Sequence, residues 1–196
     1  VFFLFAMLLG AVLQITNTFG SPFLHDFARN PVYAESFIVK YPSILLSVSQ
    51  MSEVFFILTI PFFLRRFGIK TVMLMSMVAW MLRFGLFAFG DPSATGFGLL
   101  LLSMVVYGCA FDFFNISGSV FVEQEVNSDI RASAQGLFMT TVNGIGAYVG
   151  SVLSGMAVDY FSVDGVKDWQ TIWLVFAAYA LALAVVFYLS FNYRRS

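Results

Sequence analysis

Two carboxylates and one guanidinium lie inside long apolar runs of this sequence. Glu53, Arg83 and Asp112 each lie among mainly apolar residues, and Asp112 stands within the stretch "YGCAFDFFNISG". An ionisable side chain at the centre of a membrane helix costs about 3 kcal/mol. Such residues are therefore retained where they pair with one another or where they bind a proton or a substrate. The depth of the three residues along their segments helps to distinguish these possibilities.

The two acids are predicted to lie at the same depth. Glu53 lies about 14 residues into the apolar segment 39–64, and Asp112 about 15 residues into the segment 97–122, so a rise of ~1.5 Å per residue places both near the membrane midplane. Arg83 lies only about seven residues from the end of the segment 71–90, close enough for a long side chain to reach the interface. We therefore predict a binding role for the acids and a structural role for Arg83.

Amides and aromatic rings accompany the acids at helical spacing. Positions i, i+3 and i, i+4 share one face of a helix. The candidate substrate-binding residues are Gln14, Asn17, Gln50, Glu53, Tyr107, Phe111 and Asp112, with Asn115 and Asn143 as secondary candidates. Carboxylates and amides suit hydroxyls and amide-like edges, and rings suit stacking. Because no cation is predicted at this depth, the set favours a neutral polyol or a nucleoside over an anion.

Either acid could also hold a coupling proton. Burial away from water disfavours the charged form of a carboxylate, so Asp112 or Glu53 could take up a proton on one side of a membrane and release it on the other. The alternative is that the acids belong to a structural ion pair. An intramembrane protease with two catalytic aspartates is disfavoured, because one of the two acids is Glu, and we do not expect an enzyme.

The composition is that of an integral membrane protein. Of 196 residues, 60% are hydrophobic and 11% are charged, against roughly 25% charged in soluble domains. The net charge of −1 gives no basic footprint for nucleic acid. One cysteine, Cys109, and one histidine, His25, exclude a disulfide within the chain and a metal site built on these residue types. We expect no metal and no cofactor other than a coupling proton.

Six segments are long and apolar enough to cross a bilayer, which takes about 20 residues. They cover 1–27, 39–64, 71–90, 97–122, 132–160 and 170–191. Basic residues concentrate on one predicted side, at Arg65, Arg66, Lys70, Arg131, Arg194 and Arg195, against Arg29, Lys40 and Lys167 on the other. The positive-inside rule makes the first side cytoplasmic, and six spans then place both chain ends there. The chain begins without Met, and we expect it to be part of a longer protein.

The polar residues repeat after three segments. Gln14 and Asn17 in the first segment match Asp112 and Asn115 in the fourth, each pair at i, i+3 and near mid-segment. Because three spans separate the two segments, they run in opposite directions, and the match predicts a 3+3 inverted repeat. In the fifth segment, Gly146, Gly150 and Ser154 are spaced by four, which predicts close packing against another helix.

Four runs resemble a known family. They are "LLGAVLQITNTFG", "SQMSEVFFILTIPFFLRRFGIK", "YGCAFDFFNISGSVFVE" and "IRASAQG", and they are similar to the C-terminal half of the nucleoside:proton symporters of the major facilitator superfamily. The resemblance implies a six-helix half of a twelve-helix fold in a bacterial inner membrane, with the nucleoside between the halves and an N-terminal half as partner. It implies nucleoside import with protons by alternating access. It also implies substrate contacts at the motif positions that match the candidate residues.

Two departures and two alternatives accompany this resemblance. The N-terminal half is missing from the sequence, so this chain alone is not expected to transport. Some relatives carry an acid where Val12 stands here, which leaves the identity of the coupling residue open. A sugar or oligosaccharide:proton symporter would use the same hydroxyl-binding acids. A structural or receptor bundle would not need two acids at equal depth.

Overall fold

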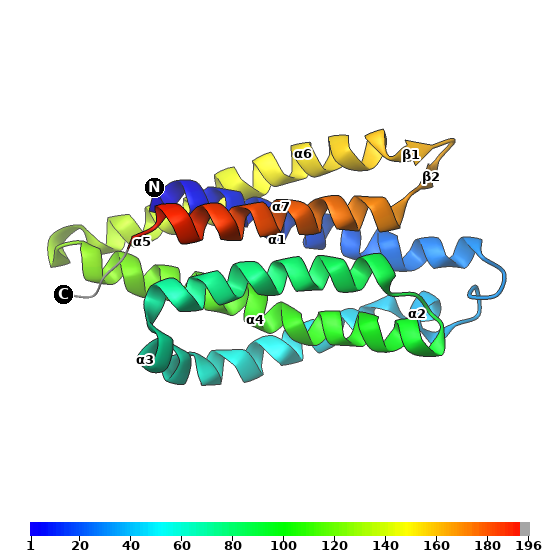
Figure 1. The fold of residues 1–196 in the computed structure, drawn as a ribbon, viewed down its shortest axis with the longest axis horizontal. Coiled ribbons are helices and arrows are strands. Elements are labelled where there is room, and N and C mark those ends of the chain that lie inside the picture. Colours follow the sequence, from blue (N-terminus) through cyan, green and yellow to red (C-terminus); the bar gives the residue numbers. More distant parts are fainter. Residues whose placement is uncertain (193–196) are drawn as a thin grey trace.

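The computed structural model describes residues 1–192 as an almost entirely helical bundle (Figure 1). The helices are α1 (Phe2–Asp26), α2 (Phe37–Lys40), α3 (Pro42–Phe89), α4 (Ala94–Glu125), α5 (Arg131–Thr140), α6 (Ala147–Tyr160) and α7 (Trp169–Ser190). Short 3-10 turns η1 (Phe27–Arg29) and η2 (Ser128–Ile130), a π-helical turn η3 (Thr141–Gly146) and two antiparallel strands, β1 (Ser162–Val163) and β2 (Val166–Lys167), complete the order. Arg194 and Arg195, predicted to be cytoplasmic, lie outside the described residues.

Helix α3 crosses the molecule twice. Its 48 residues would extend about 72 Å if straight, far more than a bilayer core of ~30 Å. At Gly68 the backbone has φ 77° and ψ 166°, which is a conformation that only glycine adopts readily. Figure 1 shows the chain reversing there into two antiparallel legs. We call residues 42–67 the first leg and residues 69–89 the second leg.

The bundle therefore has six membrane crossings. Five helical stretches are long and apolar enough to cross a membrane: Phe2–Arg29, Pro42–Phe89, Ala94–Glu125, Ser128–Tyr160 and Trp169–Ser190. The second of these contributes both legs of α3, and the fourth is continuous through α5, η3 and α6. The predicted bundle of six membrane-crossing helices is confirmed.

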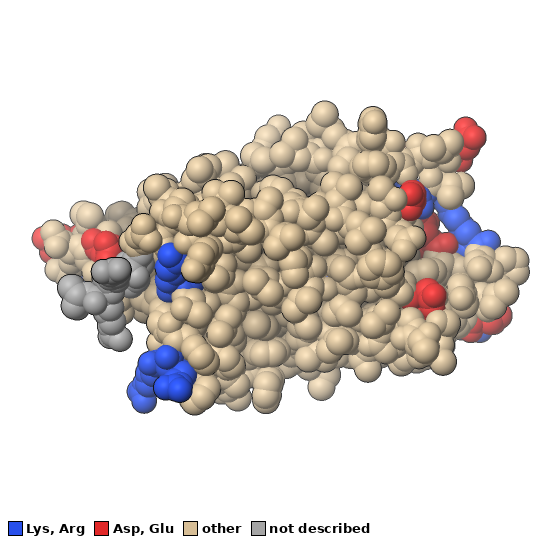
Figure 2. Space-filling view, in the orientation of Figure 1, with Lys and Arg blue, Asp and Glu red and all other residues tan. Residues whose placement is uncertain are grey.

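Charged side chains gather at the two ends of the molecule. In the face shown in Figure 2, Lys, Arg, Asp and Glu lie at the ends and a wide uncharged band separates them. One end holds the N-terminus, the Gly68 reversal and the α4–α5 connection; the other holds α2 and the β1–β2 hairpin (Figure 1). We call the second one the β-hairpin end. An uncharged band between two charged ends is the expected surface of a membrane-spanning bundle.

Small residues bring α1 and the α5–η3–α6 segment into backbone contact. A Cβ atom added to Gly150 would lie 2.5 Å from Ala11 Cα, and one added to Gly146 would lie 2.5 Å from the Met7 carbonyl oxygen. Ser154 is buried on the same helix. The predicted close packing is therefore confirmed for Gly146 and Gly150, with α1 as the partner helix.

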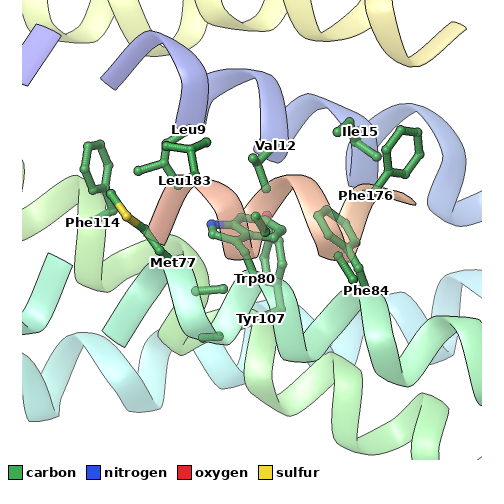
Figure 3. Close-up of a cluster of buried hydrophobic side chains, with 14 of the residues drawn as sticks. Leu9, Val12, Ile15, Met77, Trp80, Phe84, Tyr107, Phe114, Phe176 and Leu183 are labelled. Carbon is green, nitrogen blue, oxygen red and sulfur yellow. The ribbon is translucent and has the colours of Figure 1, made fainter. Parts of the chain in front are cut away.

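The apolar core lies where α1, the second leg, α4 and α7 meet. The labelled side chains of Figure 3 come from all four: Leu9, Val12 and Ile15 of α1, Met77, Trp80 and Phe84 of the second leg, Tyr107 and Phe114 of α4, and Phe176 and Leu183 of α7. Burial of these large apolar and aromatic side chains fixes α4 against the second leg. The polar residues of α4 are positioned by this packing.

Candidate functional site

A close crossing of α4 with the first leg of α3 positions the candidate residues. The Ser52 hydroxyl accepts a hydrogen bond from the Gly108 backbone N–H at 3.1 Å and donates to the Val105 carbonyl. A Cβ atom on Gly108 would lie 2.4 Å from Ser52 Oγ, so only glycine permits this approach. Glu53 follows Ser52, and Tyr107 precedes Gly108. The crossing therefore fixes the position of the acid relative to the ring.

Tyr107 and Phe111 form the predicted aromatic pair. Their rings are stacked, with centroids 5.8 Å apart and planes inclined by 4°. Trp80 from the second leg meets the Tyr107 ring edge-on at 5.7 Å and 87°, and the two residues lie side by side in Figure 3. Phe111 and Asn115 also line a small cavity together with Trp80 and Leu13. Rings fixed in this way can stack on a planar ligand.

Asp112 is buried, and the structure gives its side chain no hydrogen-bond partner within residues 1–192. Its side chain is 3% exposed, and its Oδ2 atom meets no donor among the described residues. Glu53 is half-buried and lies close enough for the two carboxylates to interact electrostatically. An unpartnered carboxylate oxygen in apolar surroundings is costly unless a proton or an external donor satisfies it. The Asp112 carboxylate therefore leaves an oxygen free to accept a proton or a ligand hydroxyl, and its binding role stays a prediction.

The candidate amides do not all meet the acids. Gln14 donates to Thr18 Oγ1 at 3.2 Å on its own helix, and Asn115 donates to the Phe111 carbonyl at 2.9 Å. Asn143 is exposed, and its amide lies 3.7 Å from Met139 Sδ. Asn17 and Gln50 are exposed as well. The structure thus gathers Glu53 and the α4 residues, and it leaves most of the amides on open surfaces, where their role stays a prediction.

The prediction for Arg83 is wrong in its geometry. We expected its side chain to reach the membrane interface, but Arg83 is only 1% exposed. Its guanidinium lies 4.5 Å from the centroid of the Tyr107 ring and donates to the Ser103 carbonyl at 2.6 Å. The rings of Tyr107 and Phe87, with centroids 4.5 Å and 4.8 Å from the guanidinium carbon, keep it inside. Distance from a segment end did not reveal this, because it ignores which face of the helix is buried.

Two further residues were missed by the sequence reasoning. Ser52 and Trp80 shape the site through the α3–α4 crossing and through the Tyr107 ring. Serine and tryptophan are common in membrane helices, so these residue types alone did not indicate a site. The position of Ser52 directly before Glu53 was the sequence feature that could have pointed to it. In the part of the chain that the structure describes, no three His, Cys, Asp or Glu side chains lie close enough to hold a metal ion.

The sequence of this chain is similar to those of known transport proteins. The family model described as "Nucleoside H+ symporter" matches residues 1–196. The xanthosine permease of Escherichia coli (strain K12) is 84% identical over 193 residues, which are 98% of this chain and 46% of the permease. The nucleoside permease NupG of the same organism is 60% identical over 194 residues, 99% of this chain and 46% of that protein.

A solved structure shows the same fold. The crystal structure of the nucleoside transporter NupG superposes with a TM-score of 0.93 at 60% identity, covering 98% of this chain and 48% of that one. The chain thus spans about half the length of the relatives it matches. The family model covers every residue of the sequence, and the structural match covers nearly all of the chain. This chain belongs to the nucleoside H+ symporter family.

Proposed function

We propose that this chain is the C-terminal six-helix half of a secondary transporter, rather than an enzyme, that imports nucleosides together with protons by alternating access. What supports this most is the family match across residues 1–196, because it includes every candidate site residue. The polar surfaces of this half would then face a matching N-terminal half across the substrate. Polar groups inside a membrane require such a covered or water-lined surface.

The substrate would bind beside the α3–α4 crossing. The Tyr107–Phe111 pair would enclose a nucleobase by stacking, and Glu53 and Asp112 would accept hydrogen bonds from ribose hydroxyls. Gln14, Asn17 and Gln50 would contact the substrate from the open surface, with Asn115 and Asn143 at its margin. Planar rings at this place favour a base over a sugar alone, so a sugar symporter is not favoured.

The coupling proton would reside on Asp112 or on Glu53. Asp112 is the more buried of the two, and its Oδ2 atom has no partner among the described residues. Neutralising one acid lowers the cost of holding both in the low-dielectric interior while the bundle rocks against its partner half. The chemistry needs no metal and no organic cofactor.

The orientation follows from charge. The end that holds the Gly68 reversal carries Arg65, Arg66 and Lys70, with Arg131 at the start of α5. We propose that this end, with both ends of the chain, faces the cytoplasm of a bacterium, and that the bundle lies in the inner membrane. The β-hairpin end then faces outward.

The proposed function is tested by uptake in cells that express the full-length permease. Xanthosine is the first substrate to try, because the relative that is 84% identical is named a xanthosine permease; uridine and adenosine follow. The expected result is nucleoside accumulation that a protonophore abolishes and that excess disaccharide leaves unchanged. Accumulation that persists with a protonophore would contradict proton coupling. Uptake of the disaccharide itself, with no uptake of any nucleoside, would contradict the substrate class.

A further inference from the structure

Arg83 is a buried cation that forms no ion pair among the described residues. Within residues 1–192, no carboxylate oxygen lies within 4.0 Å of a nitrogen of Arg83. Its Nε atom meets no acceptor at all among these residues. A guanidinium in a membrane interior is expensive, and most intramembrane cations pair or reach water. The polar and aromatic groups that surround Arg83 therefore have to account for its presence.

Those surroundings consist mainly of aromatic faces. The guanidinium carbon lies 4.5 Å from the Tyr107 ring centroid and 4.8 Å from that of Phe87. A cation over the face of an aromatic ring is attracted by the negative charge density there, most strongly where water is excluded. The one strong hydrogen bond goes to the Ser103 carbonyl, one turn before Tyr107 on α4. Arg83 thus holds both the ring of Tyr107 and the backbone beside it.

The Tyr107 ring is in this way fixed by three side chains. Arg83 lies over it, Trp80 meets it edge-on, and Phe111 stacks on it. Only Phe111 belongs to the predicted substrate-binding set; Arg83 and Trp80 come from the second leg of α3. A guanidinium is planar and can stack on a ring, whereas an ammonium acts as a point charge. Lys at this position would therefore keep the positive charge and lose the stacking on the Tyr107 ring.

We propose that Arg83 is a positioning residue that orients Tyr107 for the nucleobase and does not itself touch the substrate. The inference rests on the proposed function, since it concerns the affinity of the same site. Glu53 lies within electrostatic range of Arg83, so the guanidinium also attracts this carboxylate. Loss of Arg83 should weaken substrate binding through Tyr107 while leaving the turnover of bound substrate intact.

The test measures nucleoside uptake by the full-length permease carrying Arg83→Lys, Arg83→Gln, Tyr107→Leu and the double variant Arg83→Gln with Tyr107→Leu. We expect Arg83→Gln to raise KM about five- to thirtyfold, Arg83→Lys to restore it only in part, and the maximal rate per folded molecule to change less than KM. In the Tyr107→Leu background, Arg83→Gln should add little, because the ring it positions is gone. Phe84→Leu, another buried change on the second leg, is the control for lost packing.

The outcomes separate the two claims. KM unchanged in both Arg83 variants, or raised equally with and without the Tyr107 ring, would overturn the positioning role and leave Arg83 as a packing residue. A KM increase in Phe84→Leu as large as that in Arg83→Gln would overturn it as well. If Arg83→Gln does not reach the membrane, Arg83→Lys decides by the same criterion, since it keeps the charge. No nucleoside uptake by the unmutated permease would overturn the proposed function and this inference with it.

Discussion

Several charged side chains at the β-hairpin end are ion-paired, whereas those in the middle of the bundle form no ion pair among the described residues. At the β-hairpin end, Asp26 accepts from Lys167 at 3.2 Å and from the Trp169 indole N–H at 2.9 Å, and it pairs with Arg29 at 3.5 Å. Arg29 also donates to the Gly165 carbonyl at 2.8 Å. In the middle, Glu53, Arg83 and Asp112 form no ion pair among the described residues.

This difference separates charges that fix structure from charges that are available for ligands. A paired carboxylate such as Asp26 ties α1 to the β-hairpin and α7, and nothing is left to bind. A carboxylate such as Asp112, which forms no ion pair among the described residues, lowers the stability of the fold. We expect such a residue to be retained because it serves transport. The comparison predicts that changes in the middle alter transport and that changes at the β-hairpin end alter stability.

The largest expected effect comes from the crossing that holds the middle together. Gly108→Val would place a Cβ atom 2.4 Å from Ser52 Oγ and force α4 away from the first leg. We expect loss of folded protein, or destabilisation of about 3 kcal/mol or more, measured by thermal unfolding of the purified permease. Gly98→Val on the same helix is the control, because nothing lies within 4 Å of its Cβ position. Equal unfolding temperatures of the two variants would contradict the described crossing.

The next effect should fall on substrate affinity alone. Glu53→Gln replaces an unpaired carboxylate, and hydrogen bonds to charged groups contribute about 1.5–3 kcal/mol, so KM for the nucleoside should rise roughly ten- to a hundredfold. The control is Glu123→Gln, whose exposed carboxylate pairs with Arg131 at 3.4 Å. An equal change of KM in both variants would contradict the prediction that Glu53 binds the substrate and Glu123 does not.

A smaller effect on stability is expected at the β-hairpin end. Asp26→Asn removes the carboxylate shared by Lys167, Arg29 and Trp169, and should destabilise the protein by about 1–2 kcal/mol with KM unchanged. Thermal unfolding and uptake are measured on the same preparation. Asp164→Asn, on the exposed hairpin tip at φ 51°, serves for comparison because Asn tolerates that conformation. An Asp26→Asn variant with normal stability and raised KM would reverse the proposed division.

The smallest effect concerns the first turn of α7. Asp168 accepts from the Thr171 N–H at 3.1 Å and from its hydroxyl at 2.6 Å, and these hydrogen bonds lower the pKa of Asp168 below its ordinary value of 3.8. Its stabilising contribution is therefore present above that ordinary value and is lost as the pH falls through the lowered pKa. Asp168→Ala should cost about 1 kcal/mol at neutral pH and less in acid.

The check is the unfolding temperature of Asp168→Ala across a series of pH values, with Gln170→Ala as the neighbouring control. A pH-independent difference between Asp168→Ala and the unmutated protein would show that the carboxylate does not act through its charge. Uptake should be unaffected, because this residue lies at the β-hairpin end.

Much of the fold could be predicted from the sequence because the membrane restricts it. Apolar length defined the six crossings, and the spacing of Gly146 and Gly150 predicted the contact with a neighbouring helix. The reversal at Gly68 was readable from "RRFGIK" as a loop, although the hydrogen-bonding pattern runs on through it. The partner of Gly146 and Gly150 was not predictable, because spacing within one helix does not identify the helix that packs against it.

The site was predictable in its residues and less so in its geometry. Stacking of Tyr107 on Phe111 follows from i, i+4 spacing on one helix. The burial of Arg83 over Tyr107 depends on how the second leg is rotated against α4, which is a tertiary property. Depth along a segment placed Arg83 near the interface, but the buried face of its helix kept it inside.

The most direct test of the central claim is proton-driven uptake by the Asp112→Asn variant of the full-length permease. Purified protein in liposomes receives an imposed pH gradient, and nucleoside accumulation is followed with and without a protonophore. If the unpaired acid in the middle serves transport, accumulation by the variant should fall to the level seen with the protonophore, while its unfolding temperature stays close to that of the unmutated protein. Normal gradient-driven accumulation by Asp112→Asn would contradict the account and make Asp112 a structural residue.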